Sequence, residues 1–124
     1  MVNIILDTNF LLIPAQFGVD IFAEISRVCD QHTLWIMEST IAELQAIARK
    51  RGRNGAAAKV ALELARRHDL QQIPSTENVD SAILAHATEG WIVGTQDRAL
   101  RAQLRRKHIP LLTMKGKSHL AIEG

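Results

Sequence analysis

Four carboxylates follow or flank short apolar runs at intervals along the 124-residue chain. The first is the clearest, because the β-branched run Ile4-Ile5-Leu6 stops at Asp7 and the turn-forming pair Thr8-Asn9 follows. The other acids stand where a short strand is expected to end or the next helix to begin. The four acids are Asp7, Glu43, Asp80 and Asp97. Acids placed in this way can meet at one edge of a sheet, so the pattern predicts a shared metal site.

Four carboxylates in close proximity would repel one another and raise the pKa of some of them unless a cation neutralised them. Oxygen ligands that leave room for water suit Mg²⁺ or Mn²⁺. Such an ion, or a pair of ions, activates a water and stabilises the leaving oxygen when a phosphodiester is cleaved in line. The polar neighbours expected to orient the carboxylates or the metal-bound waters are Thr8, Asn9, Ser81 and Thr95.

Each acid also has a purely structural explanation. Glu43 could close a capping box with Thr40, and Asp80 and Asp97 lie near helix starts, where the helix dipole favours an anion. Asp7 could hold its own turn. These explanations do not account for all the helix starts falling at one sheet edge, so we favour the joint prediction of a metal site.

Two basic clusters accompany the acids. The formal net charge of +2 is small, so the distribution of the charges matters more than their sum. We expect the clusters to hold a phosphate backbone in a sequence-independent, salt-sensitive way, although solvated surface is the alternative for each cluster. The residues predicted to hold this phosphate backbone are Arg49, Lys50, Arg51 and Arg53 in the first cluster, and Arg98, Arg101 and Arg105 in the second.

Composition excludes several other classes. A single cysteine rules out an intramolecular disulfide and fits a reducing compartment. No apolar run approaches the roughly 20 residues of a membrane span, so we expect a cytoplasmic protein without a membrane partner. The five histidines lack zinc-ligand spacing, and an aromatic content of 4% argues against a base-stacking platform.

The elements that must position the acids alternate along the chain. Short apolar runs predict strands at residues 2–6, 33–37, 70–73, 91–93 and 110–113. Helical spacing predicts a short turn at 10–13 ended by Pro14, and helices at 19–30, 39–50, 56–67, 79–88 and 97–107, with 79–88 buried almost all round. The tail after residue 114 receives no assignment. This alternation predicts one α/β domain over residues 1–124 with a mostly parallel sheet, and ligands collect at the carboxyl edge of such a sheet.

The acids belong to four short motifs that occur in a definite order. The motifs are Leu6-Asp7-Thr8-Asn9, Glu43-Leu44, Asp80-Ser81-Ala82-Ile83-Leu84 and Thr95-Gln96-Asp97-Arg98-Ala99-Leu100. The ordered set, spread over residues 1–113, resembles the PIN domain family. The resemblance implies a three-layer α/β/α fold with about five strands and a ribonuclease that depends on Mg²⁺ or Mn²⁺. By this resemblance, the four acids of the family correspond to Asp7, Glu43, Asp80 and Asp97, and the family hydroxyl corresponds to Thr95.

Residues 9–14 and 16–22 look most like an archaeal branch, which is similar to the PIN nucleases that process pre-ribosomal RNA in the small-subunit processome. This likeness implies a structured or ribosomal RNA partner. Members of the family often dimerise, which implies a homodimer that uses apolar surface within residues 10–22. PIN toxins are the nearest rival, and an antitoxin partner belongs to that alternative. Ser81 stands where relatives of the processing branch often carry a second acid, which favours one bound metal over two.

Two further functions remain open from the residues alone. One is a weakly active RNA-binding or scaffolding domain, for which Ser81 is the supporting feature and the retained four acids are the opposing one. The other is a regulatory module that accepts a phosphoryl group on Asp7. The acid pair and the lysine that such modules carry are missing here, so this alternative is poor.

Overall fold

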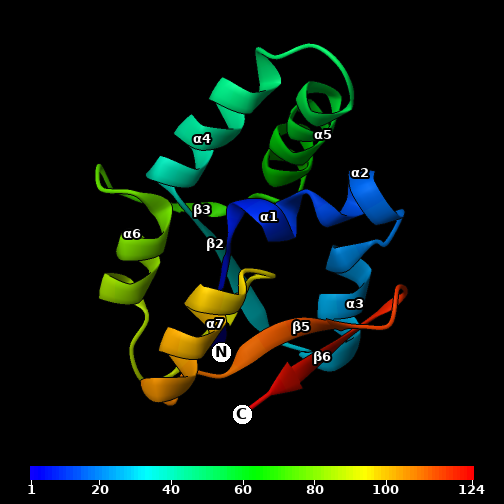
Figure 1. Ribbon diagram of the computed structural model, residues 1–124. Helices are drawn as coiled ribbons and strands as arrows, with labels where there is room; N and C mark the ends of the chain where they lie inside the picture. Colours follow the sequence, from blue (N-terminus) through cyan, green and yellow to red (C-terminus); the bar gives the residue numbers. More distant parts are fainter.

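A six-stranded sheet with β1 inside it organises the computed structural model, which describes residues 1–124 (Figure 1). The strand order is β3-β2-β1-β4-β5-β6, and all neighbours are parallel except the antiparallel pair β5 and β6. The strands are β1 (Val2–Leu6), β2 (His32–Met37), β3 (Gln71–Ile73), β4 (Trp91–Gly94), β5 (Leu111–Lys115) and β6 (His119–Glu123). The chain builds outward from β1 through β2 to β3 and then returns to the other side of β1, so the strand order switches between β1 and β4.

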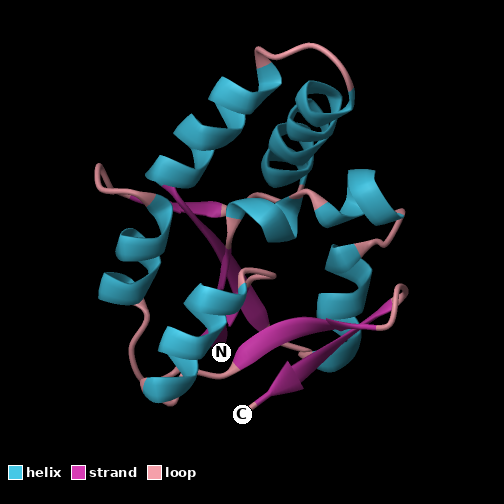
Figure 2. Ribbon diagram, viewed as in Figure 1, coloured by secondary structure: helices cyan, strands magenta, loops and turns pink.

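Helices cover both faces of this sheet and produce three layers (Figure 2). The side chains of β1 alternate between the layers, because Ile4 and Leu6 join one apolar cluster and Ile5 joins the other. The first cluster packs under α1 to α5, and the second packs under α6 and α7. The helices are α1 (Thr8–Leu11), α2 (Ile13–Phe17), α3 (Ile21–Val28), α4 (Glu38–Ala48), α5 (Arg53–Arg67), α6 (Val79–His86) and α7 (Arg98–Arg106). The predicted α/β/α architecture is confirmed, with six strands rather than about five.

Three local predictions were wrong. Pro14 does not end a helical turn but lies in the first turn of α2, where a missing N–H costs no hydrogen bond. Helix α5 starts at Arg53, before the predicted residue 56, and includes the buried Gly55. A Cβ atom on Gly55 would lie within 1.9 Å of the carbonyl oxygen of Lys50, so this glycine permits the tight turn between α4 and α5. Helix α6 buries one face only, through Val79, Ala82 and Ile83.

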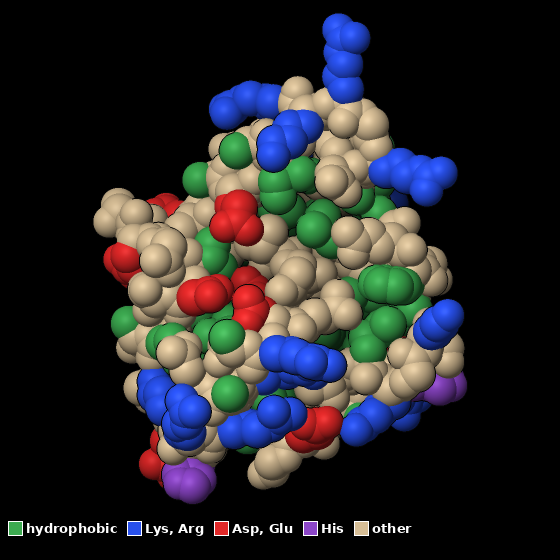
Figure 3. Space-filling view, in the orientation of Figure 1, with side chains coloured by type: hydrophobic (Ala, Val, Ile, Leu, Met, Phe, Trp, Pro, Cys, Tyr) green, Lys and Arg blue, Asp and Glu red, His purple; other side chains and the backbone are tan.

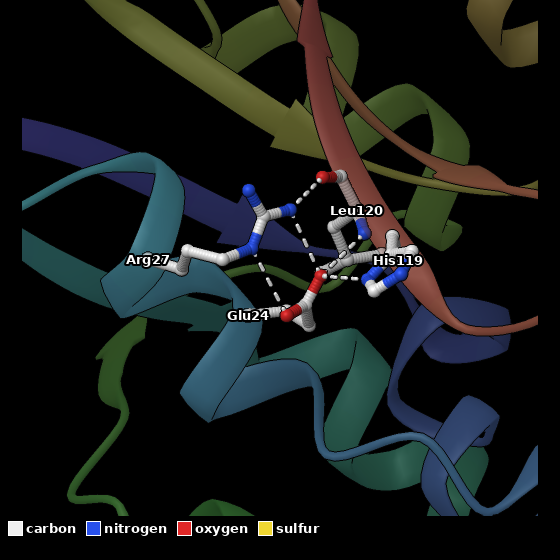
Figure 4. A network of polar contacts seen from close by, with 4 residues as sticks. All are labelled: Glu24, Arg27, His119 and Leu120. Atoms are coloured by element: carbon white, nitrogen blue, oxygen red, sulfur yellow. Dashed lines mark hydrogen bonds and ion pairs between the residues drawn. The ribbon is translucent and has the colours of Figure 1, made fainter.

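The sixth strand, for which no local pattern predicts an element, is held at the sheet edge by α3 (Figure 4). The carboxylate of Glu24 accepts a hydrogen bond from the backbone N–H of Leu120 at 2.9 Å. Arg27 donates to the same carboxylate at 3.0 and 3.1 Å and to the carbonyl oxygen of Leu120 at 2.8 Å. Two charged side chains therefore satisfy both peptide groups of Leu120, although these lie 93 to 96 residues away in the sequence.

Replacing Glu24 with glutamine is expected to loosen this strand. Hydrogen bonds from Arg27 and from the Leu120 amide lower the pKa of Glu24 to about 2. The carboxylate therefore stabilises the fold above its ordinary pKa of 4.5, and this contribution is lost as the pH falls toward 2. At neutral pH we expect hydrogen exchange at the Leu120 amide to accelerate about tenfold in Glu24→Gln. Glu63→Gln is the matched control, because Glu63 pairs only with arginines of its own helix. Equal exchange in both variants would contradict the assigned role of Glu24.

Candidate metal centre

Asp7 stands at the point where the strand order switches. Its backbone N–H donates to the carbonyl oxygen of Gly94 at 2.9 Å, which joins the carboxyl ends of β1 and β4. Its side chain caps α1, since one carboxylate oxygen accepts from the N–H of Thr8 at 2.8 Å. The other oxygen accepts from the hydroxyl of Thr95 at 2.7 Å. Asp7 is only 3% exposed, so the first acid of the predicted site is a buried carboxylate with a defined orientation.

Burial raises the pKa of Asp7 to about 6. The hydrogen bonds from Thr95 and Thr8 oppose this rise, while the negative charges of Asp80 and Glu43 add to it. Two acids from α4 and α6 therefore lie near enough to act on Asp7. The carboxylates of Asp80 and Glu43 therefore raise the pKa of a buried carboxyl group that no cationic side chain neutralises.

Asp80 and Asp97 approach one another at the starts of α6 and α7. Partial burial and the charge of Asp97 raise the pKa of Asp80. Asp80 does not cap its helix, because Asn78 does so by accepting from the N–H of Ser81 at 2.9 Å. Asp97 does cap α7, with one oxygen accepting from the N–H of Leu100 at 3.0 Å. The structural explanation considered for Asp97 therefore holds for one of its two oxygens.

Glu43 is not part of a capping box. Helix α4 follows β2 without a loop and begins at Glu38, so Thr40 lies inside the helix and Glu43 lies in its second turn. The backbone N–H of Ser39 donates to the hydroxyl of Ser75 at 3.0 Å, and the two serine hydroxyls share a hydrogen bond at 2.8 Å. Glu43 is exposed and has no hydrogen-bond partner, which leaves its carboxylate free to bind a ligand.

Acidic side chains gather in the middle of one face, where α1, α4, α6 and the start of α7 converge (Figure 3). In this arrangement no three or more Asp, Glu, His or Cys side chains are close enough to hold an ion. The donors nevertheless fit a hard cation, since all are carboxylate oxygens and the charge on Asp7 is uncompensated. The hydroxyl of Thr8, next to Asp7, is also buried without a partner. The residues present therefore fit Mg²⁺ or Mn²⁺, with rotation of the exposed carboxylates toward Asp7.

The polar neighbours have distinct positions. The Thr95 hydroxyl donates to Asp7 and accepts from the N–H of Asp97 at 3.1 Å, so it links two of the acids. The side-chain oxygen of Asn9 accepts from the N–H of Gln96 at 3.0 Å, and this bond fastens the loop before α7 to α1. Ser81 is exposed on α6 and its hydroxyl has no partner. Thr95 and Asn9 thus orient the site through contacts that sequence spacing alone does not show.

Known proteins resemble this chain over nearly its whole length. A family model described as a PIN like domain matches residues 4–117. The chain belongs to the PIN domain family. The resemblance seen in the four motifs is thereby confirmed. A curated relative, Ribonuclease VapC4 of Methanocaldococcus jannaschii, is 30% identical over 129 residues, which cover 100% of this chain and 98% of the relative.

Solved structures share the fold of this PIN domain. The PIN domain endonuclease Utp24 superposes with a TM-score of 0.74 at 22% identity, covering 98% of this chain and 90% of that one. VapBC2 from Rickettsia felis, bound to a DNA fragment from its promoter, matches with a TM-score of 0.65 at 17% identity, covering 91% and 99%. At these identities the likeness supports the three-layer fold.

Basic side chains flank the acidic group of the PIN domain on two sides, over the turn between α4 and α5 and over α7 (Figure 3). Arg98 at the start of α7 is exposed and unpaired, whereas Arg105 pairs with Glu123 at 3.1 Å and ties α7 to β6. The residues of the first predicted cluster are all exposed and make no ion pair: Arg49, Lys50, Arg51 and Arg53. Positive charge therefore lies on both sides of the candidate site.

Lys107 holds together the two helices that carry Asp80 and Asp97, a role that no sequence pattern predicts. Its ammonium group donates to the carbonyl oxygens of Leu84 and, at 2.9 Å, of Ala87 at the end of α6. Nothing local marks this contact, because the partners lie 20 and 23 residues apart in the sequence. The local feature that comes nearest to predicting it is a lysine directly after the last residue of α7, the next helix along the chain after α6.

Replacing Lys107 with methionine is expected to destabilise the PIN domain by about 1–2 kcal/mol, because the last carbonyls of α6 lose a charged donor. Urea unfolding at neutral pH measures the effect. Lys59→Met is the control, since Lys59 is exposed on α5 without a partner. Identical unfolding midpoints for the two variants would show that the contact with α6 contributes nothing.

Proposed function

We propose that this PIN domain is a metal-dependent endoribonuclease that cleaves phosphodiester bonds in RNA. The observation that carries the proposal is a buried, hydrogen-bonded Asp7 on which the charges of Glu43 and Asp80 act, with Asp97 acting on Asp80, in a chain of the PIN family. The acids that would hold Mg²⁺ or Mn²⁺ are Asp7, Glu43, Asp80 and Asp97. The name of the curated relative, Ribonuclease VapC4, supports the same class of activity.

The metal, when bound, supplies the activated water and the charge that stabilises the leaving oxygen. The protein contributes orientation. Asp7 is kept in one position by Thr95 and Thr8, so it is the fixed carboxylate against which the more exposed acids close. Asp97 keeps one oxygen for its helix and offers the other. A site with Ser81 rather than an acid after Asp80 carries less negative charge and suits one ion better than two.

The basic groups on either side of the acids would hold the RNA backbone through phosphate contacts. We infer that the substrate is a structured RNA, and we place the activity in ribosomal RNA processing, because residues 9–14 and 16–22 resemble that archaeal branch.

No helix of the protein has the length and apolar character needed to cross a membrane. We assign the activity to the cytoplasm. For a homodimer, the segment 10–22 offers Phe17, which is 49% exposed, whereas Phe10 and Phe22 are buried.

A toxin role is the second candidate, and the 30% identity to Ribonuclease VapC4 is the observation in its favour. Under this alternative an antitoxin would bind and restrain the nuclease. Induced expression in a host without the antitoxin discriminates the two roles. Rapid growth arrest with cleavage of a small set of cellular RNAs would support the toxin, and normal growth would support processing.

Cleavage of a labelled structured RNA by the purified protein tests the proposed activity itself. Reactions with Mn²⁺, with Mg²⁺ and with EDTA run in parallel. Cleavage in the presence of either metal and none in EDTA would support the nuclease. If the protein binds the RNA but does not cut it with either metal, a binding or scaffolding domain replaces the enzyme.

A further inference from the structure

Arg101 differs from every other arginine in the protein. It is half-buried on α7, it takes part in no ion pair, and its Nε atom is buried without a hydrogen-bond partner. The remaining arginines fall into two groups, one paired with glutamates and the other exposed to water. The paired arginines are Arg27, Arg66, Arg67 and Arg105, and the exposed unpaired ones are Arg49, Arg51, Arg53, Arg98 and Arg106.

A partly desolvated cation without a partner opposes folding, because water is removed and nothing replaces it. The guanidinium of Arg101 has five N–H donors in a planar fork, and the buried Nε–H among them binds no other group of the protein. Such an arrangement lowers stability unless a ligand supplies the partner. A planar fork matches the oxygens of a phosphate better than it matches water.

The position of Arg101 on α7 points to the same ligand. Asp97 caps this helix, and Arg101 follows four residues later, so the two side chains lie on one face. Side chains on a helix lean toward its N-terminus, which directs Arg101 toward the acidic end. An ion pair with Asp97 would be expected at this spacing, but none forms, and Asp97 binds the N–H of Leu100 instead. Arg101 therefore makes no ion pair with the acid one turn before it on α7.

We propose that Arg101 binds one phosphate of the RNA strand, next to the metal-binding acids. This inference rests on the proposed function for the identity of the ligand. Arg101 would contact the phosphate at one defined phosphodiester linkage, whereas the exposed basic residues would attract the whole RNA backbone without a fixed position. The terminal Nη1 and Nη2 groups of the half-buried side chain would make this contact, because the Nε atom is shielded from solvent.

Binding of a 2′-O-methyl RNA in EDTA tests the proposal without requiring cleavage. A set of RNAs, each with one phosphate replaced by an uncharged methylphosphonate, is titrated against wild type, Arg101→Met and Arg101→Lys. In wild type we expect a single substituted linkage to weaken binding about tenfold. Arg101→Met should bind the unsubstituted RNA about tenfold more weakly and lose its sensitivity at that linkage, and Arg101→Lys should recover part of both. Arg106→Met, on the exposed side of the same helix, should retain the wild-type pattern.

Thermal unfolding of the free protein separates a ligand contact from a structural role. Removing an unpaired, half-buried cation should leave the melting temperature of Arg101→Met equal to or above that of wild type, whereas a structural arginine would lower it. A fall in melting temperature with unchanged RNA affinity would overturn the proposal, as would a wild-type linkage profile in Arg101→Met. Absence of metal-dependent cleavage alongside the expected linkage profile would reject the nuclease and leave the phosphate contact standing.

Discussion

Asp7→Asn is expected to lower RNA cleavage by roughly a thousandfold or more, because it removes the charge of the only buried acid in the site. Asparagine has nearly the same shape, and its side-chain oxygen can still accept a hydrogen bond from Thr95 or Thr8. The substitution therefore tests charge rather than packing. Single-turnover cleavage of a labelled RNA with saturating Mn²⁺ measures the loss.

Asp20→Asn is the matched control for this substitution. Asp20 also caps a helix, accepting from the N–H groups of Phe22 and Ala23 at 3.1 and 3.0 Å, but its charge does not act on the acidic group. Asparagine is as good a cap as aspartate, so this variant should cleave within about twofold of wild type. Cleavage by Asp7→Asn at the rate of the control would remove Asp7 from the metal site.

The same substitution at Asp7 is expected to stabilise the metal-free protein by about 2–3 kcal/mol near pH 7.5. Burial raises the pKa of Asp7 from 3.8 to about 6. Between these two values the folded protein holds a proton that the unfolded chain releases, so folding stability falls as the pH rises through this window. Above the higher value the loss is complete and constant. The asparagine side chain of the variant does not titrate, so the variant avoids the loss.

Urea unfolding in EDTA near pH 4.5 and near pH 7.5 measures this effect. The gap in unfolding free energy between Asp7→Asn and wild type should widen toward the higher pH. Added Mn²⁺ should stabilise wild type near pH 7.5 and have little effect on the variant, because a ligand that binds only the folded state raises its stability. Parallel pH profiles for the two proteins would contradict the raised pKa of Asp7.

The sequence by itself determined the frame of this site. The apolar run of β1 ending at Asp7, and the short strand of β4 ending before Thr95, are signals carried by neighbouring residues, and the alternation of strands and helices follows from the same local patterns. The ordered motifs then identified the family, which the match over residues 4–117 confirmed. Local patterns are sufficient here because the helices bury one stripe of their own residues, whereas β1 and β4 are short apolar runs buried on both faces.

The tertiary structure alone decided which of these residues are free and which are engaged. Glu43 does not form the predicted capping box, because α4 starts directly after β2. Arg105 forms an ion pair with Glu123 on β6, a strand that local sequence does not predict. Lys107 closes the end of α6, and Arg101 remains without a partner one turn from Asp97. Each outcome depends on where a distant segment places a charge or a carbonyl group. Such long-range contacts leave no periodic pattern in the chain, so only the folded arrangement reveals them.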